Sequence, residues 1–274
     1  MSALHESIDG LVIRVKDMGD HDRYLTVLTA KKGRITILSK GSRSIKGEQR
    51  AVSQLYTYGN FEFYRKGTLY ILKGGAPIHP FYALSLDIDR LNLAAYFCDL
   101  AYELSDEGED AQEMLRLLLN SLYAISRELY PRELVKAAFE MRAAAINGYA
   151  PDLSHCAYCE KDTDPNLYLD VMNGALVCSD CLQKRGRAAK NIGTYDDIRE
   201  ADILVPLTIP VCDALRFILK TPMERLFSFE LREKEDLKTL CTAAETYILS
   251  HLGRGFDSLD FYHSMLESAK GMIT

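Results

Sequence analysis

Four cysteines in two close pairs are the residues of this chain best suited to specific chemistry. Cys156 and Cys159 form one C-x2-C pair, Cys178 and Cys181 form the second, and 18 residues separate the pairs. Each pair makes a tight turn that aims two thiolates at one point, and Zn2+ accepts four such ligands in a tetrahedron. Because protein atoms fill all four positions, the spacing predicts a structural Zn2+ rather than a catalytic one.

The segment between the pairs carries a strong hairpin signal. Asn173-Gly174 is flanked by apolar residues on both sides, and such a turn would return the second pair to the first. The alternative is two redox C-x-x-C pairs, but a thioredoxin-like motif would need a βαβ context that is missing here. His155 adjoins Cys156, and we interpret it as a neighbouring residue that does not bind the metal as a fifth ligand. Three further cysteines fall on apolar helix faces, where buried, inert thiols are expected: Cys98, Cys212 and Cys241.

The first part of the chain reads as a small β-barrel. From Ile8 to Ala76 apolar residues alternate with period two, as at Leu11, Ile13 and Val15, which is typical of half-buried strands. We count five strands, the fourth beginning near Leu55. Five short strands joined by Gly-containing turns suit a closed barrel, and the OB-fold is its five-stranded form.

Helical periodicity begins after His79-Pro80 and returns beyond the cysteines. Pro131 and Gly148 bracket one of these helices. The sequence therefore predicts a multidomain α+β protein. Its parts are an OB-fold DNA-binding domain over 1–80, a helical domain over 81–150 and 201–274, and a zinc-binding module inserted over 151–200.

Positive charge is concentrated near the start of an acidic chain. Residues 1–80 hold 13 Lys and Arg against 7 Asp and Glu, whereas the whole chain has a formal net charge of −6. Such asymmetry indicates a local site for a polyanion. The stretch LSKGSRSIKGEQR, residues 38–50, predicts a flexible basic loop beside the barrel, able to follow a phosphate backbone. The alternative is a loop whose charges only keep it solvated.

The same loop is not a nucleotide-binding P-loop. Gly41 to Lys46 lacks the second glycine of that motif, and Gly47 follows where Ser or Thr is required. Aromatic residues nearby suggest single-strand binding instead, since a base stacked on an exposed ring contributes ~1–3 kcal/mol. Phe61 and Phe63 occupy alternate positions of one predicted strand, so we expect both side chains in the core. The candidates for base stacking are Tyr56, Tyr58, Tyr64 and Tyr70.

No motif of covalent catalysis is present. The metalloprotease H-E-x-x-H, nucleophile-elbow G-x-S-x-G and dinucleotide G-x-G-x-x-G patterns are all absent, so we predict that the protein is not an enzyme. No apolar run approaches the ~20 residues that cross a bilayer, and the start MSALHESIDG lacks the features of a secretory signal. We expect a cytoplasmic protein without membrane partners.

Several separated stretches together resemble one family, the bacterial recombination mediator RecO. The likeness covers nearly the whole chain, including a G-x-x-D-R turn at Gly19, a basic K-G-x-R loop at Lys40 and cysteines that match the zinc-bearing branch. His21 departs from the small polar residue that is frequent there. The stretches are DGLVIRVKDMGDHDRYLTVLTAKKGRITILSKGSRS, YGNFEFYRKGTLYIL, FEMRAAAINGYAPDLSHCAYC and ILSHLGRGFDS.

The resemblance implies an activity and partners that spacing alone does not give. Family members bind single- and double-stranded DNA, anneal complementary strands, and work with RecR to load RecA onto strands coated by single-strand-binding protein (SSB). They also bind the acidic, apolar C-terminal tail of SSB through the helical domain, for which Arg127, Arg132 and Arg142 are candidates here. A nucleoid-associated protein is therefore expected.

Combining the charge pattern with the resemblance, we predict ten DNA-binding cations. They are Arg14, Arg23, Lys31, Lys32, Arg34, Lys40, Arg43, Lys46, Arg50 and Arg65. Two other functions compete with a DNA-repair mediator. One is an RNA-binding OB-fold protein with a structural zinc module, because contacts to a sugar-phosphate backbone alone do not distinguish RNA from DNA. A zinc-dependent enzyme is the other, and the filled four-thiolate site disfavours it.

Overall fold

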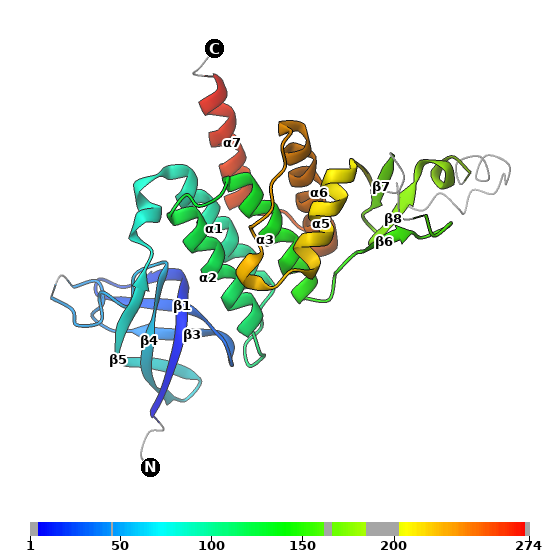
Figure 1. Cartoon of the computed structure of the whole chain (residues 1–274). Coiled ribbons are helices and arrows are strands. Elements are labelled where there is room, and N and C mark those ends of the chain that lie inside the picture. Colours follow the sequence, from blue (N-terminus) through cyan, green and yellow to red (C-terminus); the bar gives the residue numbers. More distant parts are fainter. Residues whose placement is uncertain (1–4, 45, 162–165, 185–202, 272–274) are drawn as a thin grey trace. The chain divides into compact units, whose positions relative to one another are not determined.

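The chain folds into two compact units (Figure 1). The structure is a computed structural model that describes residues 5–44, 46–161, 166–184 and 203–271. Unit 1 comprises Met1–Leu129 and Phe256–Thr274, and unit 2 comprises Tyr130–Gly255. The predicted zinc module spans residues 151–200. Two of its segments, 162–165 and 185–200, lie outside the described residues.

A five-stranded sheet in unit 1 closes into a barrel. Its strands are β1 (His5–Met18), β2 (Asp22–Thr29), β3 (Gly33–Ser39), β4 (Thr57–Lys66) and β5 (Leu69–Pro80). β1 pairs antiparallel with both β2 and β4, and β3 pairs antiparallel with β2 and parallel with β5. The antiparallel β4–β5 pair completes the ring, so no strand is left with an open edge.

Alternate residues of the strands fill the barrel. Successive side chains of a strand point to opposite faces, which is why the period-two pattern of the sequence supplies one continuous core. Val52, from the loop between β3 and β4, closes that core. Leu55 lies in the same loop and is 41% exposed, so β4 begins later than predicted. The core residues are Val12, Leu25, Val27, Ile35, Ile37, Val52, Phe61, Phe63 and Leu72.

Three helices and one short 3-10 helix complete the described part of unit 1. They are η1 (Tyr82–Leu86), α1 (Ile88–Glu103), α2 (Gln112–Ser126) and α7 (Asp257–Gly271). α1 and α2 contact β1, and α7 packs on α1. As a result β1 departs from the predicted half-buried pattern. Leu11 and Ile13 are at most 2% exposed, although they face away from the barrel core that contains Val12.

Unit 2 combines helices with a small mixed sheet. In its described part the helices are α3 (Arg132–Ile146), α5 (Ile209–Lys220), the 3-10 helix η2 (Met223–Arg225) and α6 (Lys234–Leu252), and residues 179–184 are also helical. Its strands are β6 (Asp152–Cys156), β7 (Leu167–Asp170), β8 (Ala175–Cys178) and β9 (Leu204–Leu207), in the order β6-β8-β7-β9. α3 begins directly after Pro131, and Gly148 beyond its end has a φ of 84°, which confirms the predicted brackets. Among the described helices of both units, none combines the length and apolarity that a bilayer span requires.

A buried ion network joins α3 to α6 inside unit 2. The ammonium of Lys136 donates to Glu140 at 2.7 Å and to Glu245 at 2.6 Å, and the side chains of Lys136 and Glu140 are 4% and 0% exposed. Burial acts to lower the pKa of Lys136. The charges and hydrogen bonds of the two carboxylates outweigh that effect, so the pKa of Lys136 lies above the usual value. Lys136 therefore stays protonated.

Removing that cation should destabilise unit 2 strongly. Lys136→Met leaves the carboxylate of Glu140 buried without its ammonium, and we expect the free energy of unfolding to fall by ~3–5 kcal/mol in urea denaturation followed by circular dichroism. Lys238→Met is the matched control, because Lys238 lies on α6 with its side chain 78% exposed, and it should change stability by less than ~0.5 kcal/mol. Equal effects of the two variants would contradict the account.

Candidate metal centre and nucleic-acid interface

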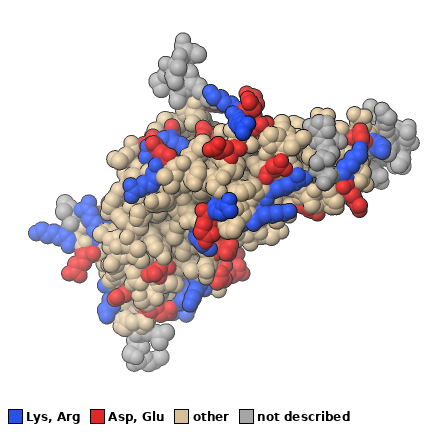
Figure 2. Space-filling view, viewed as in Figure 1, with Lys and Arg blue, Asp and Glu red and all other residues tan. Residues whose placement is uncertain are grey.

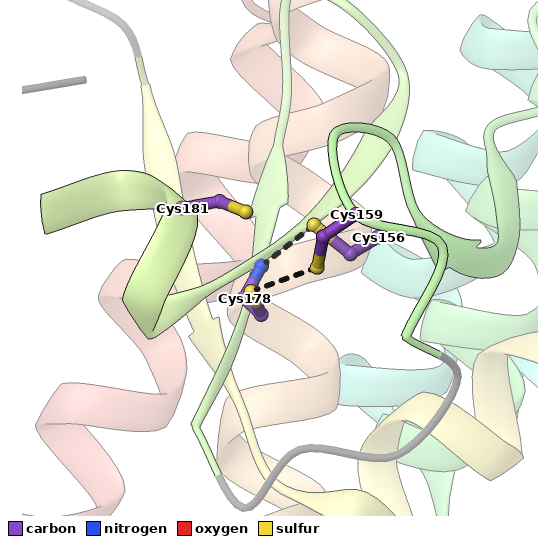
Figure 3. A group of neighbouring side chains, drawn as sticks. All are labelled: Cys156, Cys159, Cys178 and Cys181. Atoms are coloured by element: carbon purple, nitrogen blue, oxygen red, sulfur yellow. Dashed lines mark hydrogen bonds between the residues drawn. The ribbon is translucent and has the colours of Figure 1, made fainter. Parts of the chain in front are cut away.

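The four cysteines of unit 2 converge on one point (Figure 3). Cys156 ends β6 and Cys178 ends β8, while Cys159 lies in the turn after β6 and Cys181 in the helical residues 179–184. The antiparallel β7–β8 hairpin returns the second pair to the first, as predicted from Asn173-Gly174. Its connection spans residues 171–174.

The geometry of the four sulfurs fits a tetrahedral metal ion. All four Sγ atoms lie within 4.8 Å of one another, and Cys159 Sγ and Cys178 Sγ are 3.6 Å apart. With Zn–S bonds of about 2.3 Å, a tetrahedral site places its sulfurs ~3.8 Å apart. A disulfide would need about 2.05 Å instead. The donor set therefore fits Zn2+, with Cys156, Cys159, Cys178 and Cys181 as its ligands.

Backbone N–H groups favour the thiolate form of Cys156. Burial alone would raise its pKa, but N–H groups of Cys178, Tyr158 and Cys159 donate to it and lower the pKa below the usual value. The N–H of Cys178 lies 3.3 Å from Cys156 Sγ. Thiolates are the metal-binding form, so the turn geometry prepares this ligand.

His155 and the other three cysteines are not part of the four-cysteine site. His155 Nδ1 is hydrogen-bonded to Ser154 Oγ at 2.9 Å. Cys98 and Cys212 are buried, and burial raises the pKa of each thiol. Cys241 is partly exposed and donates to the carbonyl of Glu133 at 3.4 Å. Within the described part of the chain, no other cluster of three or more potential ligands was found.

In unit 1, two of the predicted DNA-binding cations hold α1 against the barrel. Arg14 donates to Asp99 at 2.7 Å, and Arg34 donates to the carbonyl of Tyr102 at 2.6 Å and to Asp106 at 3.2 Å. The guanidinium carbons of Arg14 and Arg34 lie 3.6 and 4.0 Å from the centre of the Tyr102 ring. These contacts give both arginines an internal structural role.

Three more predicted cations form ion pairs with acids of the barrel. Arg23 donates to Asp17 at 2.9 Å, and Arg43 lies 3.4 Å from the other oxygen of the same carboxylate. Lys32 pairs with Glu6. Their charge is partly neutralised before any ligand arrives.

The other predicted cations are exposed. For none of them does the described structure show an ion pair with an acid; Arg65 donates only to the carbonyl of Gly67, at 3.0 Å. Lys66 and Lys73 are also exposed, and the predicted set omitted them although they are basic residues of the same segment. Figure 2 shows Lys and Arg side chains projecting from the loop at the left edge of the view, with acidic side chains beside them. The exposed members of the predicted set without an ion pair in the described structure are Lys31, Lys40, Lys46, Arg50 and Arg65.

The loop between β3 and β4 is held by hydrogen bonds at several points. The N–H of Gly41 donates to Asp22 at 2.8 Å, and the N–H of Arg43 donates to the carbonyl of His21 at 3.1 Å. A Cβ on Gly47 would lie 2.4 Å from the carbonyl oxygen of Gly41. The glycines, predicted to make the loop adaptable, thus serve a left-handed turn at Gly41, with φ of 67°, and a close backbone contact at Gly47.

The four tyrosines predicted to stack with bases differ in exposure. Tyr56 is only 7% exposed and adopts φ of 60°, and burial raises the pKa of its phenol. A ring so buried offers no face to a base, so Tyr56 leaves the candidate set. Tyr58, Tyr64 and Tyr70 are half-buried, and Tyr70 packs edge-on against Phe63 at 5.0 Å.

An open groove runs between the barrel and α1 within unit 1. Its volume is about 610 Å3. Residues of β1, β2 and β3 line one side, including Lys16 and Tyr24, and Asp99 and Tyr102 of α1 line the other. The groove places aromatic and cationic groups beside the strands.

Comparison with known proteins gives this architecture a family. A model described as "Recombination protein O N terminal" matches residues 1–81, and one described as "Recombination protein O C terminal" matches residues 85–191. The chain belongs to the recombination protein O family. It is 30% identical to the DNA repair protein RecO of Acetivibrio thermocellus, over 93% of this chain and 95% of that protein. It is also 24% identical to the DNA repair protein RecO of Clostridium kluyveri, over 96% and 95% respectively.

Membership assigns the chain a role in recombinational DNA repair. The family is named for recombination and the relatives for DNA repair, so this is a recombination protein. The family resemblance inferred from the sequence is confirmed.

The metal centre predicts a specific loss on mutation. Cys178→Ser removes a buried thiolate ligand, so protein purified without chelators should fall from about one Zn2+ per chain to well below that, and unit 2 should unfold at lower urea concentration. Elemental analysis by mass spectrometry measures the metal. Cys241→Ser is the control, since serine can keep the hydrogen bond to Glu133, and it should retain the metal. Wild-type protein without zinc would refute the site.

The contact between Arg34 and α1 predicts a stability effect separate from DNA binding. Arg34→Ala removes two hydrogen bonds and a ring contact, and we expect the free energy of unfolding to fall by about 1–3 kcal/mol. Thermal unfolding measures the loss. Lys31→Ala, three residues away on an exposed turn, should leave stability within ~0.5 kcal/mol of the wild type. A neutral Arg34→Ala would contradict the structural role.

Proposed function

We propose that this chain is a recombination mediator that binds single- and double-stranded DNA through an OB-fold barrel in unit 1. The strand order β1-β2-β3-β5-β4, closed by the β1–β4 pair, supports the OB-fold assignment. The observation that carries the DNA-binding proposal is the set of exposed cations on the β3–β4 loop, Lys40, Lys46 and Arg50, which have no ion pair in the described structure.

Charge neutralisation explains how such a surface acts on DNA without ATP. Each lysine or arginine that contacts a phosphate releases a condensed counterion, which favours binding at low salt. When the surface holds two complementary strands, their mutual repulsion falls, and base pairing then proceeds spontaneously. Strand annealing is therefore the activity that we propose for the loop.

The proposed role includes partners that the family resemblance implies. The protein acts in the cytoplasm on the nucleoid, where it works with RecR to load RecA onto single strands coated by SSB. Arg142 donates to the carbonyl of Thr221 at 2.5 Å and also to that of Ile218, beside the end of α5. We therefore assign Arg142 a structural role rather than contact with the SSB tail. Arg127 and Arg132 stay the candidates for contacting the SSB tail.

The proposed Zn2+ holds the fold of unit 2 and performs no chemistry. Four protein thiolates fill a tetrahedral site, which leaves no position for water. DNA is preferred over RNA as the ligand because the relatives are DNA repair proteins.

Reversing the charge of the loop should weaken DNA binding. For the double variant Lys40→Glu/Lys46→Glu we expect lower affinity for a single-stranded oligonucleotide, and a log-log salt slope smaller in magnitude by ~1.4, or 0.7 per lost phosphate contact. Fluorescence anisotropy over a salt series measures both. Lys234→Glu/Lys238→Glu changes the net charge equally on exposed residues of α6 and should bind as the wild type does. Identical slopes in the two double variants would overturn the proposal.

Annealing of SSB-coated complementary oligonucleotides tests the mediator role itself. The Lys40→Glu/Lys46→Glu variant should anneal more slowly than the wild type, while its circular dichroism spectrum stays unchanged. Competition between matched DNA and RNA strands should favour DNA. Unchanged annealing by the double variant would contradict the proposed role of the β3–β4 loop in strand annealing.

A further inference from the structure

A second, smaller depression lies where the β3–β4 loop meets the segment after β5. Its volume is about 420 Å3, within the ~300–1,000 Å3 typical of ligand pockets, although it is open to solvent. Its lining combines polar and charged side chains with apolar ones. It is lined by Gly47, Glu48, Arg50, Ala51, Gln54 and Tyr82.

Backbone and side-chain hydrogen bonds hold the two walls together. The N–H of Phe81 donates to the carbonyl of Tyr56 at 3.2 Å, which fixes the start of η1 beside the end of the loop. Within the loop, Gln54 Nε2 donates to the carbonyl of Arg50 at 2.8 Å, and the N–H of Arg50 donates to the carbonyl of Gly47 at 3.0 Å. The side chains therefore stand on a defined backbone.

Tyr82 is the most exposed large aromatic residue of the described structure. It is 62% exposed, compared with 7% for Tyr56, and its ring makes no ring–ring or cation–π contact with the other described residues. Arg50, on the opposite wall, is exposed and has no ion pair with the described acids. A bare aromatic face beside an unneutralised guanidinium is complementary to a nucleotide, which offers a planar base and a phosphate.

We propose that Tyr82, Arg50 and Gln54 form a binding site for one unpaired nucleotide of a DNA strand. The base stacks on Tyr82, the adjoining phosphate pairs with Arg50, and Gln54 and Glu48 meet polar groups on the edge of the base. The site rests on the proposed DNA binding and deepens it. A duplex keeps its bases stacked inside, so this site favours single strands and the frayed ends from which annealing starts.

An apolar protein partner is the competing occupant of this region. Leu86 and Ile88, just beyond Tyr82, are 84% and 51% exposed. Neither lines the depression, however, and the charges of Arg50 and Glu48 at its wall suit a polar ligand. The nucleotide is therefore the occupant that the lining favours.

The site is tested by measuring binding of two matched single strands, one with its bases and one abasic. Tyr82→Ala should weaken binding of an ordinary single strand by roughly 5- to 150-fold, the range expected for loss of one stacked base. It should leave binding of an otherwise identical strand of abasic sugar-phosphate unchanged, because only the stacking partner is lost. Tyr82→Trp should retain wild-type affinity for the ordinary strand.

The matched control is Leu86→Ala, which removes an exposed apolar side chain from the same 3-10 helix outside the depression. It should bind both strands as the wild type does. Equal losses in Tyr82→Ala and Leu86→Ala would overturn the proposal, as would a Tyr82→Ala variant that binds the ordinary strand normally while the wild type shows a steep salt slope. In that second case the loop proposal survives; a wild type that binds no DNA would refute both.

Photo-crosslinking locates the contact directly. A single strand containing 5-iodouracil should crosslink at Tyr82, identified by mass spectrometry of the peptide that carries it, and Tyr82→Ala should abolish that product. Crosslinks confined to Tyr58, Tyr64 or Tyr70 would place base stacking on the barrel strands instead and overturn the site.

Discussion

The carboxylate of Asp99 links three elements of unit 1. From α1 it accepts hydrogen bonds from Arg14 of β1 at 2.7 Å and from Ser258 of α7 at 2.8 Å, so one side chain joins barrel, first helix and last helix. Tyr102, one turn further along α1, lies against Arg14 and Arg34. A buried or half-buried cation needs an acid, a π-face or water beside it, and these contacts give Arg14 and Arg34 partners within the protein.

The same constraint sorts the remaining cations of the barrel. Asp17 lies near Arg23 and Arg43, and Glu6 pairs with Lys32. Exposed cations without such a pair in the described structure are left on the β2–β3 turn, on the β3–β4 loop and on β4 and β5. The β3–β4 loop carries three of them, Lys40, Lys46 and Arg50, and Asp22 and the backbone of His21 hold that loop to the β1–β2 turn. Internal pairing thus partly neutralises Arg23, Arg43 and Lys32, and its absence at those three loop cations in the described structure leaves the β3–β4 loop available to phosphates.

Features set by short-range sequence were predictable, and features set by distant contacts were not. The zinc ligands follow from C-x2-C spacing and a hairpin, both local, and the strands follow from the alternation that fills the barrel. Arg14 and Asp99 are 85 positions apart, and Arg34 and Asp106 are 72 apart, so nothing near either arginine reveals its partner. Tyr56 was misjudged because a left-handed backbone, with φ of 60°, turns it inward. Tyr82 lies in η1, just beyond the barrel, so the strand pattern of the barrel does not indicate it.

Lysine footprinting in the presence of a single-stranded oligonucleotide tests the central claim most directly. The claim is that unpaired cations on the β3–β4 loop contact phosphates, so bound DNA should protect Lys40 and Lys46 from acetylation, with the protection disappearing at high salt. Lys234 and Lys238 on α6, equally exposed, should react at the same rate with and without DNA. Unchanged reactivity of Lys40 and Lys46 under conditions where DNA is bound would contradict the account.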